Sequence, residues 1–443
     1  MPRNEPFQTT RRRALKTLGT IGFFGLAGCQ TDTEEQTPTS GNRTSPTTTT
    51  EGSERQTTQV FTFDPETPDS ETVTHPSDPW PDVTPTGNPM YRDDPNWRMV
   101  SHDTGKTGHN PYASGPSTEP TVRWTFDAGG SYWDQKRYYY PTIVDGTVYV
   151  GSVKEKNRGL VAIDAETGDV EQVVETEQYL QKPTIIDGVA YTVLGSGLGA
   201  YDLADGATLW ETEKFARNPS PPIRVGNRVV SGRDGFLFGF DAATGSQSWS
   251  LGDGGRYLGR PIIADGTIVQ EGLDALVDLQ TGKKRTKLPW DIKFPSLSGG
   301  ELYGLEGTGI QSLDWETLEP RWSTPGTENR KIMGSSPGLV GDIEISIQTK
   351  ELDEYWAVAR DRETGEKVWS TPPIKTTPYF IVTDTETAFL VSPLFPLVAV
   401  DLGTGEIRWK FTPPGETALG CGVALADDLL VVADGSGKLW ALE

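Results

Sequence analysis

The sequence is poor in the residues that most often carry catalysis and metal binding. Its 443 residues include two cysteines and three histidines, and His75, His102 and His109 all lie in the N-terminal quarter. Two cysteines exclude a disulfide-dense scaffold and a zinc site built from four cysteines. Most of the chain therefore has no imidazole for base catalysis or metal binding.

Positive charge is scarce as well. The chain has 40 Lys and Arg against 62 Asp and Glu, a net charge of −22 and a pI near 4.6. This balance argues against nucleic acid as a partner, because its recognition needs a basic footprint. The sequence is instead rich in turn formers and large aromatics, with 50 Gly, 33 Pro and 13 Trp, a composition that favours β-structure.

The N-terminus has the pattern of an export signal. A basic stretch at residues 10–16 precedes an apolar run from Leu18 to Gly28, too short to span a bilayer. Arg11 and Arg12 resemble the pair of a twin-arginine signal, although Ala14 stands where that pattern often has Phe. The ending Leu-Ala-Gly-Cys29 resembles a lipobox, in which the cysteine is lipidated. Residues 1–29 are thus predicted to be a twin-arginine lipoprotein signal; the alternative is a cytosolic basic tail.

The next segment, residues 30–95, is predicted to be a disordered stalk. It is rich in Thr, Ser, Pro and acidic residues, and residues 31–96 hold 13 acidic against three basic side chains. Such a composition cannot bury enough apolar surface to fold. The stalk would hold a domain away from the membrane surface, and the sequon at Asn42 is a candidate glycosylation site.

One motif, Asp-x-x-Thr-Gly, recurs along the rest of the chain, followed four residues later by Trp. Full copies of the turn begin at Asp164, Asp241, Asp278, Asp361 and Asp401 and end at Gly168, Gly245, Gly282, Gly365 and Gly405. Two degenerate copies run from Asp202 to Gly206 and from Asp314 to Leu318. The tryptophans are Trp210, Trp249, Trp322, Trp369 and Trp409, and the series is interrupted by Gln172 and Thr286.

The period of the motif predicts the fold. Prolines that lead each unit recur at intervals of 34 to 42 residues, from Pro141 to Pro378. Four short strands in a period near 40 are typical of a β-propeller blade. In each unit the Asp and Thr are expected to bond backbone groups within a turn, while Gly supplies the left-handed residue. The Trp is expected on the outermost strand, packed on the neighbouring blade.

The ends of the repeat region complement one another. Trp124 lies in an apparent outer strand with no blade before it, and residues 423–443 form an apparent blade without its outer strand. The N-terminal strand is therefore expected to close the C-terminal blade, which removes exposed sheet edges. The prediction is an all-β, monomeric propeller of eight four-stranded antiparallel blades over residues 121–443, preceded by a lead-in at residues 96–120.

The pattern Ala-x-Asp-x-x-Thr-Gly-x-x-x-Trp resembles the pyrroloquinoline quinone (PQQ) repeat of quinoprotein-like propellers. The stretch from Trp97 to Pro111 is similar to the lead-in of secreted PQQ-repeat lipoproteins from salt-loving archaea, a source that the acidic composition fits. The resemblance implies a structural repeat and does not by itself imply the cofactor. Quinoprotein dehydrogenases of this fold have Ca²⁺, a catalytic Asp and a disulfide between adjacent cysteines. Here Cys421 is the only cysteine of the propeller, so no catalytic, cofactor or metal residue is carried over.

The loops that join one blade to the next are expected to gather on one face around the channel mouth. They hold 11 basic and nine acidic residues, whereas the whole chain has a net charge of −22. Arg and aromatic residues are typical anchors of interfaces. This face is thus a candidate surface for an acidic partner, unless it is neutral only because acidic residues cluster elsewhere; its candidate residues are Arg137, Arg217, Arg256, Tyr257, Arg330 and Lys331.

These observations favour a non-catalytic role. We expect a lipid-anchored propeller on the extracytoplasmic face of the membrane, acting as a binding or assembly platform for an envelope or membrane protein. The bacterial outer-membrane assembly lipoprotein of the same repeat type is the nearest analogy, and no cofactor is expected. The alternatives are a PQQ- and calcium-dependent oxidoreductase of alcohols or sugars, and a small-molecule or glycan sensor.

Overall fold

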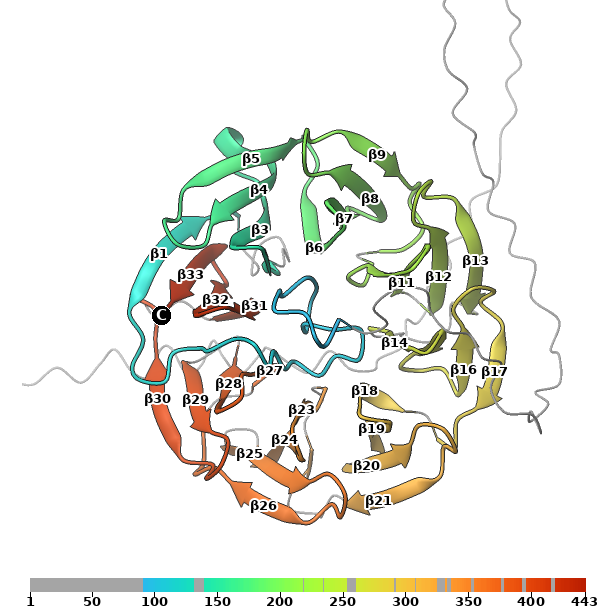
Figure 1. Ribbon diagram of the computed structural model, residues 1–443, viewed down its shortest axis with the longest axis vertical. Helices are drawn as coiled ribbons and strands as arrows, with labels where there is room; N and C mark the ends of the chain where they lie inside the picture. The colour runs from blue at the N-terminus through green and yellow to red at the C-terminus, as the bar shows by residue number, and fades with distance from the viewer. Residues whose placement is uncertain are drawn as a thin grey trace, which may run out of the picture. The chain divides into compact units, whose positions relative to one another are not determined.

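Eight β-sheets are arranged as blades around a central channel (Figure 1). The computed structural model describes residues 91–443, apart from 131–138, 218, 234, 253–259, 291, 307, 325–330, 333–335, 352–353, 376–377, 393–395 and 416–418. Each sheet is antiparallel, with consecutive strands running from the channel to the rim. The expected eight-bladed all-β propeller is confirmed.

Four strands build each of the first four blades, in order from the channel outwards. Blades 1 to 4 contain β2 (Thr142–Val144), β3 (Thr147–Ser152), β4 (Gly159–Asp164) and β5 (Val170–Glu175); β6 (Leu180–Ile186), β7 (Val189–Leu194), β8 (Gly197–Asp202) and β9 (Thr208–Glu211); β10 (Ile223–Val225), β11 (Arg228–Arg233), β12 (Phe236–Asp241) and β13 (Gln247–Gly252); and β14 (Ile262–Ala264), β15 (Thr267–Val269), β16 (Ala275–Asp278) and β17 (Lys284–Lys287). A short 3₁₀ turn, η2 (Glu155–Asn157), lies between β3 and β4.

Blades 5 to 8 follow the same order. They contain β18 (Lys293–Ser298), β19 (Glu301–Glu306), β20 (Gly309–Asp314) and β21 (Pro320–Thr324); β22 (Lys331–Ile332), β23 (Gly338–Val340), β24 (Ile343–Glu351), β25 (Glu354–Asp361) and β26 (Lys367–Ser370); β27 (Phe380–Thr383), β28 (Thr387–Val391), β29 (Leu397–Asp401) and β30 (Ile407–Phe411); and β31 (Leu419–Ala426), β32 (Leu429–Asp434), β33 (Lys438–Leu442) and β1 (Val122–Asp127). Blade 6 differs from the expected four strands, because two short strands, β22 and β23, both pair with β24.

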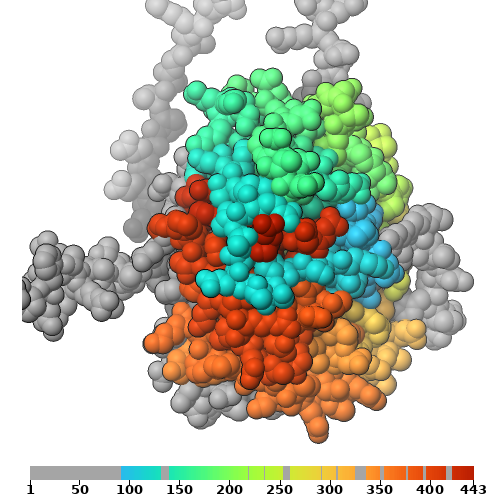
Figure 2. Space-filling model, turned by 60° about the vertical axis from the view of Figure 1, so that its left-hand side comes forward, coloured from blue at the N-terminus to red at the C-terminus, as the bar shows by residue number. Residues whose placement is uncertain are grey.

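The two ends of the propeller meet in blade 8. Strand β1 pairs with β33 in antiparallel register, with Val122 opposite Leu442 and Phe126 opposite Leu439. The guanidinium of Arg123 adds ion pairs to Glu443 at 2.7 Å and to Asp428 at 3.0 Å. Figure 2 shows this seam from the side, where cyan N-terminal residues lie among the red residues of the C-terminal blade. The ring is therefore closed by residues from opposite ends of the sequence.

The geometry of the turns explains why Asp and Gly recur in them. In blade 1, Asp145 and Gly146 have φ of 50° and 72°, the two left-handed residues of a tight hairpin turn. In the turn between β12 and β13 of blade 3, Asp241 accepts bonds from the backbone N–H of Ala243 and of Thr244, at 3.1 and 3.0 Å. The carboxylate thus accepts hydrogen bonds from backbone N–H groups that the turn would otherwise leave without partners.

The outer-strand tryptophans join neighbouring blades. The Trp210 indole N–H of blade 2 donates to the Ala242 carbonyl in the turn of blade 3, at 2.9 Å. Its ring also covers Gly245, where an added Cβ would lie 2.6 Å from the ring. The turn thus needs glycine for its φ of 69° and for the space that the ring occupies. The same bond joins Trp124 to Ala165, Trp249 to Leu279, Trp322 to Arg362 and Trp369 to Leu402.

Three blades depart from this arrangement. Blade 1 has Gln172 at the Trp position, and its side-chain amide donates to the Arg158 carbonyl of the same blade at 2.6 Å. The other two preserve the contact. Blade 8 has no turn between its third and its outer strand, and the indole of Trp409 in blade 7 donates instead to the carbonyl of Pro116, at 2.8 Å. Blade 4 has Thr286 at the Trp position. There the ring comes from the next blade: the Trp315 indole, in the turn of blade 5, donates to an Asp265 carboxylate oxygen at 3.0 Å. In the same turn Leu318, with φ of 59°, replaces the glycine.

Among the residues that the structure describes, no helix is long and apolar enough to cross a membrane.

Two substitutions of Trp369 separate the contribution of its buried ring from that of its hydrogen bond. Trp369→Ala removes a buried ring and its hydrogen bond and is expected to cost about 3–5 kcal/mol of unfolding free energy. Trp369→Phe keeps most of the apolar contact but loses the bond to Leu402, and should cost about 1–2 kcal/mol. The measurement is the urea unfolding midpoint. Val368→Ala, at a site 52% exposed, is the control and should change little; equal losses for both Trp369 variants would contradict the role of the bond.

Candidate functional site

The channel of the propeller is occupied by the chain itself. Residues 97–114 of the lead-in, called the hub segment below, run through the centre of the ring as the blue to cyan trace in Figure 1. Most of its residues are buried, and Trp97, His102, Thr104 and Asn110 are 0% exposed. The hub segment is thus an integral part of the fold.

Backbone hydrogen bonds join the hub segment to the innermost strands. An innermost strand exposes one edge to the channel, and its polar groups need partners when water is excluded. The hub segment supplies them to seven blades: Trp97 N to Ile143 O at 2.8 Å, Ile185 N to Arg98 O at 2.9 Å, Ile263 N to Thr104 O at 3.0 Å, Leu297 N to Gly105 O at 2.9 Å, Leu339 N to Thr107 O at 3.1 Å, Thr383 N to Gly108 O at 2.8 Å and Asn110 Nδ2 to Leu425 O at 2.9 Å. Blade 3 is reached by Met99, which shares an apolar cluster with Ile223.

The polar side chains of the hub segment stabilise its own bends. The Asp103 carboxylate accepts bonds from the Thr107 backbone N–H at 3.1 Å and from the Thr107 hydroxyl at 2.7 Å. Gly108 has φ of 66°, and a Cβ there would lie 2.3 Å from the Ile381 carbonyl oxygen. The segment therefore bends against blade 7 at a residue that only glycine can provide.

The two described histidines are structural. Burial lowers the pKa of His102 to about 4, so its ring is neutral at neutral pH. Its Nε2 lies 3.1 Å from the Asp94 carbonyl oxygen. His109 lies 3.0 Å from the Thr383 hydroxyl through Nδ1, and burial lowers its pKa as well. Both imidazoles are thus held inside the protein, and His75 lies outside the described residues.

Basic side chains gather inside the channel. The Lys182 ammonium, 5% exposed, donates to the Pro219 carbonyl at 2.9 Å, and the Lys106 ammonium donates to the Arg260 carbonyl. Arg260 donates to the Tyr140 hydroxyl at 2.9 Å. Burial, and then the charge of Arg260, lowers the pKa of both lysines well below its ordinary value. Burial thus favours the neutral form of both lysines, and the basic side chains of the channel are bonded to oxygen atoms of the protein.

This channel does not suit a calcium-bound quinone. Calcium takes six to eight oxygen ligands, mostly carboxylates and carbonyls. In the described ranges, no group of three or more His, Cys, Asp or Glu side chains is placed to hold a metal ion. The described channel residues therefore do not fit the calcium and quinone of this fold's dehydrogenases.

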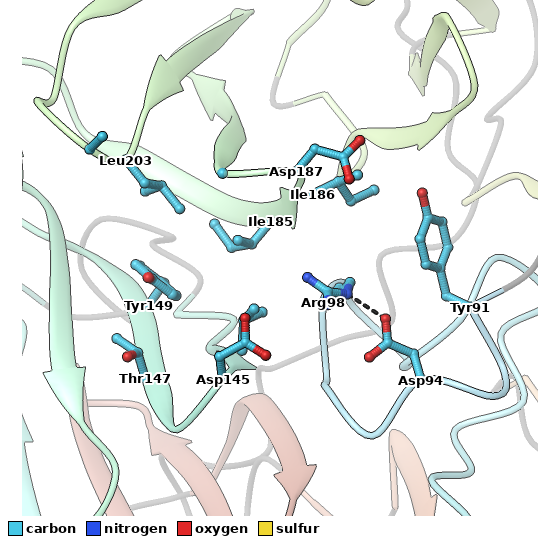
Figure 3. Close-up of a pocket in the computed structure, with 13 residues that line it drawn as sticks. Tyr91, Asp94, Arg98, Asp145, Thr147, Tyr149, Ile185, Ile186, Asp187 and Leu203 are labelled. Atoms are coloured by element: carbon cyan, nitrogen blue, oxygen red, sulfur yellow. Dashed lines mark hydrogen bonds and ion pairs between the residues drawn. The ribbon is translucent and has the colours of Figure 1, made fainter. Parts of the chain in front are cut away.

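A groove of about 630 Å³ opens between blades 1 and 2 and the start of the described chain. Figure 3 shows Asp94 paired with Arg98, and Tyr91, Tyr149, Asp145 and Asp187 around them. Its carboxylates are engaged: Asp145 accepts a bond from the Asn96 side chain at 3.3 Å, and Asp187 pairs with Arg224. The groove therefore offers polar walls without a proton donor and acceptor pair poised for catalysis.

The residues predicted for the partner face are not brought together by the described structure. Arg137, Arg256, Tyr257 and Arg330 lie outside the described residues, as do Arg11, Arg12, Cys29 and Asn42. Lys331 opens β22, and its side chain is not described. Arg217 is exposed in the connection between blades 2 and 3.

The role of the hub segment was not predicted from the sequence. Its residues lack a helical or strand period, and their partners lie far along the chain, with Thr104 bonded to Ile263 across 159 positions. The available signal was a cluster of Asn, Asp, Thr and Gly next to Trp97, which differs in composition from the Thr-rich stretch before it.

Comparison with known proteins agrees with this architecture. The model of the family described as outer membrane protein assembly factor BamB matches residues 117–323 and 195–379. BamB of Burkholderia pseudomallei strain K96243 is 26% identical over 301 residues, which are 65% of this chain and 68% of that protein. The crystal structure of BamB from Moraxella catarrhalis has a TM-score of 0.56 at 18% identity, covering 73% of this chain and 100% of that one. Quinohemoprotein alcohol dehydrogenase from Comamonas testosteroni has a TM-score of 0.57 at 12% identity, covering 80% and 81%.

Asn110 provides a test of the hub segment. Its amide donates to the Pro95 and Leu425 carbonyls at 2.8 and 2.9 Å, and its Oδ1 accepts the Tyr112 backbone N–H at 3.0 Å. Asn110→Ala leaves the buried Leu425 carbonyl without this donor, at about 1–3 kcal/mol. Hydrogen exchange followed by mass spectrometry should then show faster exchange in residues 97–114 and β27 than in β5.

Tyr112→Ala, at a side chain 56% exposed, is the matched control and should leave exchange unchanged. Unaltered protection of residues 97–114 in Asn110→Ala would show that the side chain does not hold the segment in place.

Proposed function

The chain belongs to the family of the outer membrane protein assembly factor BamB, and from this membership we propose that it is an anchored, extracytoplasmic propeller that binds envelope proteins without catalysis. The observation that carries the proposal is the filled channel. The hub segment bonds to the innermost strands of seven blades, so the centre of the ring serves the fold. Binding is left to the outer surfaces, which a rigid ring presents at low entropic cost.

The chemistry of the channel supports a role without a cofactor. Its described histidines are hydrogen-bonded, and its lysines and Arg260 donate to carbonyls or to Tyr140. The buried Asp103 carboxylate is bonded to Thr107. Catalysis by general acid and base needs groups that touch a substrate with a pKa near the working pH. We propose no catalytic residue, no metal site and no quinone for this chain.

The proposed location rests on the N-terminal sequence. Arg11 and Arg12 would direct export, Cys29 would receive the lipid, and residues 30–95 would form the stalk. Buried acyl chains supply membrane affinity through their CH₂ groups. The name that the relatives bear, outer membrane protein assembly factor, agrees with a partner in the cell envelope, and we propose that this chain binds such a protein.

The proposed partner surface is the face that carries the loops between blades. Within each blade the strands alternate in direction, so all blade-to-blade connections lie at the same end of the ring. The connections have two more basic than acidic residues, 11 against nine, in a chain of net charge −22. We propose that Arg137, Arg217, Arg256, Tyr257, Arg330 and Lys331 meet an acidic partner there.

The lipid anchor is tested by replacing the thiol that would carry the lipid. Cys29→Ser removes the thiol that would receive the lipid, and should shift the protein from the membrane pellet to the soluble fraction after export. The matched variant Arg11→Lys with Arg12→Lys keeps the charge but removes the arginine pair, and should leave the chain unexported with its signal attached. Cell fractionation and the mass of the mature N-terminus measure both outcomes; membrane retention of exported Cys29→Ser protein would refute the anchor.

The partner face is tested by charge reversal. The variant Arg256→Glu, Arg330→Glu, Lys331→Glu changes the loop face by six charges and should reduce photo-crosslinking of envelope proteins, from a photoreactive residue at position 217, by about tenfold or more. Lys367→Glu with Lys410→Glu reverses exposed charges on the rim and serves as the control. Equal crosslinking in all three proteins would exclude this face as the electrostatic contact.

A further inference from the structure

We propose that the outer strand of blade 4 is a docking edge for an extended, acidic segment of a partner protein. The proposal rests on the platform role argued above and adds a second surface, on the rim. Strand β17 is the last strand of its sheet, and Figure 1 places it at the outer edge of the ring. The outward row of backbone N–H and C=O groups on such a strand is a template for another strand.

The charge of this edge is unlike that of the chain. Residues 283–287 read Lys-Lys-Arg-Thr-Lys, with four cations in five residues, in a protein of net charge −22. Other outer strands hold fewer cations. Strand β30 has two, β1, β21 and β26 have one each, and β5, β9 and β13 have none. Blade 4 is therefore the place on the rim where an acidic segment meets the most concentrated positive charge.

Part of this charge is used within the blade. Arg285 pairs with Asp278 and donates to the Thr267 hydroxyl at 2.9 Å. The Lys284 ammonium lies 3.5 Å from an Asp274 oxygen, with 40% of its side chain exposed. Lys283 and Lys287 are exposed, and no ion pair joins either side chain to another described residue. Two complete charges and part of a third are thus available to a partner.

The departure of β17 from the repeat is compensated elsewhere. Six outer strands use a Trp to join the next element of the fold, but β17 has Thr286 at that position. Trp315 from blade 5 supplies the ring instead, and it packs in the same apolar cluster as Leu276 of β16. The joint between blades 4 and 5 therefore does not depend on the side chains of β17, which leaves this strand free to carry a binding surface.

Protection against aggregation is the simpler explanation for lysines on an edge strand. That role is served by a single charged side chain, most often lysine, and does not require four cations in five residues. In a chain with 62 acidic and 40 basic residues, a cluster of cations at an edge calls for a different cause. A row of backbone donors and acceptors beside the cations favours a polypeptide over a lipid headgroup, because only a polypeptide strand pairs with both.

The test measures binding of a labelled peptide to the full-length protein in detergent. The peptide alternates Glu and Val over eight residues, so that it presents one acidic face when extended. Fluorescence anisotropy at low ionic strength should show saturable binding. Lys283→Glu, Lys284→Glu, Lys287→Glu should weaken it by about tenfold or more, since attraction becomes repulsion at exposed side chains. Lys367→Glu with Lys410→Glu, on β26 and β30, is the matched control and should leave the affinity unchanged.

Two further probes identify what the edge binds. A peptide of the same charge with N-methyl groups on alternate residues cannot form a ladder and should bind at least tenfold more weakly than its parent. Vesicles of anionic phospholipid test the lipid surface as an alternative occupant. Equal binding of both peptides would overturn the proposal. It would also be overturned if the protein bound vesicles but no peptide, and the charge-reversed variant lost the vesicle binding. An unchanged melting temperature confirms that each variant is folded.

The outcome is separable from that of the platform role. If the peptide fails to bind while crosslinking through the loop face persists, the docking edge is wrong and the platform stands. If crosslinking fails while peptide binding at β17 follows the charges, the rim remains a binding site and the loop face is wrong.

Discussion

The bond from an outer-strand indole to the turn carbonyl of the next element is the interaction on which the ring depends. A blade is a small sheet that cannot bury both of its faces alone, so its stability lies in the joints between blades. Trp210 over Gly245 shows how the joint works: one ring fills the space that a side chain would take and satisfies a carbonyl that the turn exposes. Each contact needs a Trp from one repeat and a turn from the next, so the spacing between repeats must be kept. Where a residue of the pair is missing, the structure supplies another ring or another carbonyl, as Trp315 and Pro116 do.

The hub segment solves the opposite problem, at the inner edges of the sheets. Innermost strands converge on the channel with unpaired backbone groups, and water or ligand would otherwise have to meet them. The chain meets them with its own lead-in, whose carbonyls from Arg98 to Gly108 accept the N–H groups of successive blades. A channel that is used in this way has its polar groups committed to the fold. The same arrangement that completes the ring therefore commits the described polar groups of the channel to the fold.

The sequence predicted the blades well because their information is local and repeated. Asp, Thr, Gly and Trp at fixed spacing encode a turn and a joint, and Trp124 with Glu443 at the two ends implied the closure that β1 and β33 form. The hub segment could not be predicted in this way. Its contacts join Thr104 to Ile263 and Asn110 to Leu425, pairs separated by 159 and 315 positions. Most of its bonds to the innermost strands use backbone atoms, which any sequence has. The substitution of Trp315 for a missing ring also needed the structure, since its partner, Asp265, belongs to a different turn.

Blade 4 shows how a repeat can acquire a role without loss of the fold. A Trp on β17 would commit this strand to the contact with blade 5. Thr286 stands at that position, and Trp315 of blade 5 makes the contact instead. The freed strand then carries cations whose placement costs the fold little, because they lie at an edge in contact with water. An acidic protein repels acidic partners over most of its surface, so a local reversal of sign sets where such a partner can approach. The backbone edge beside those lysines adds direction to the attraction, since a strand pairs along one line only. Charge and edge together thus define a site that neither would define alone.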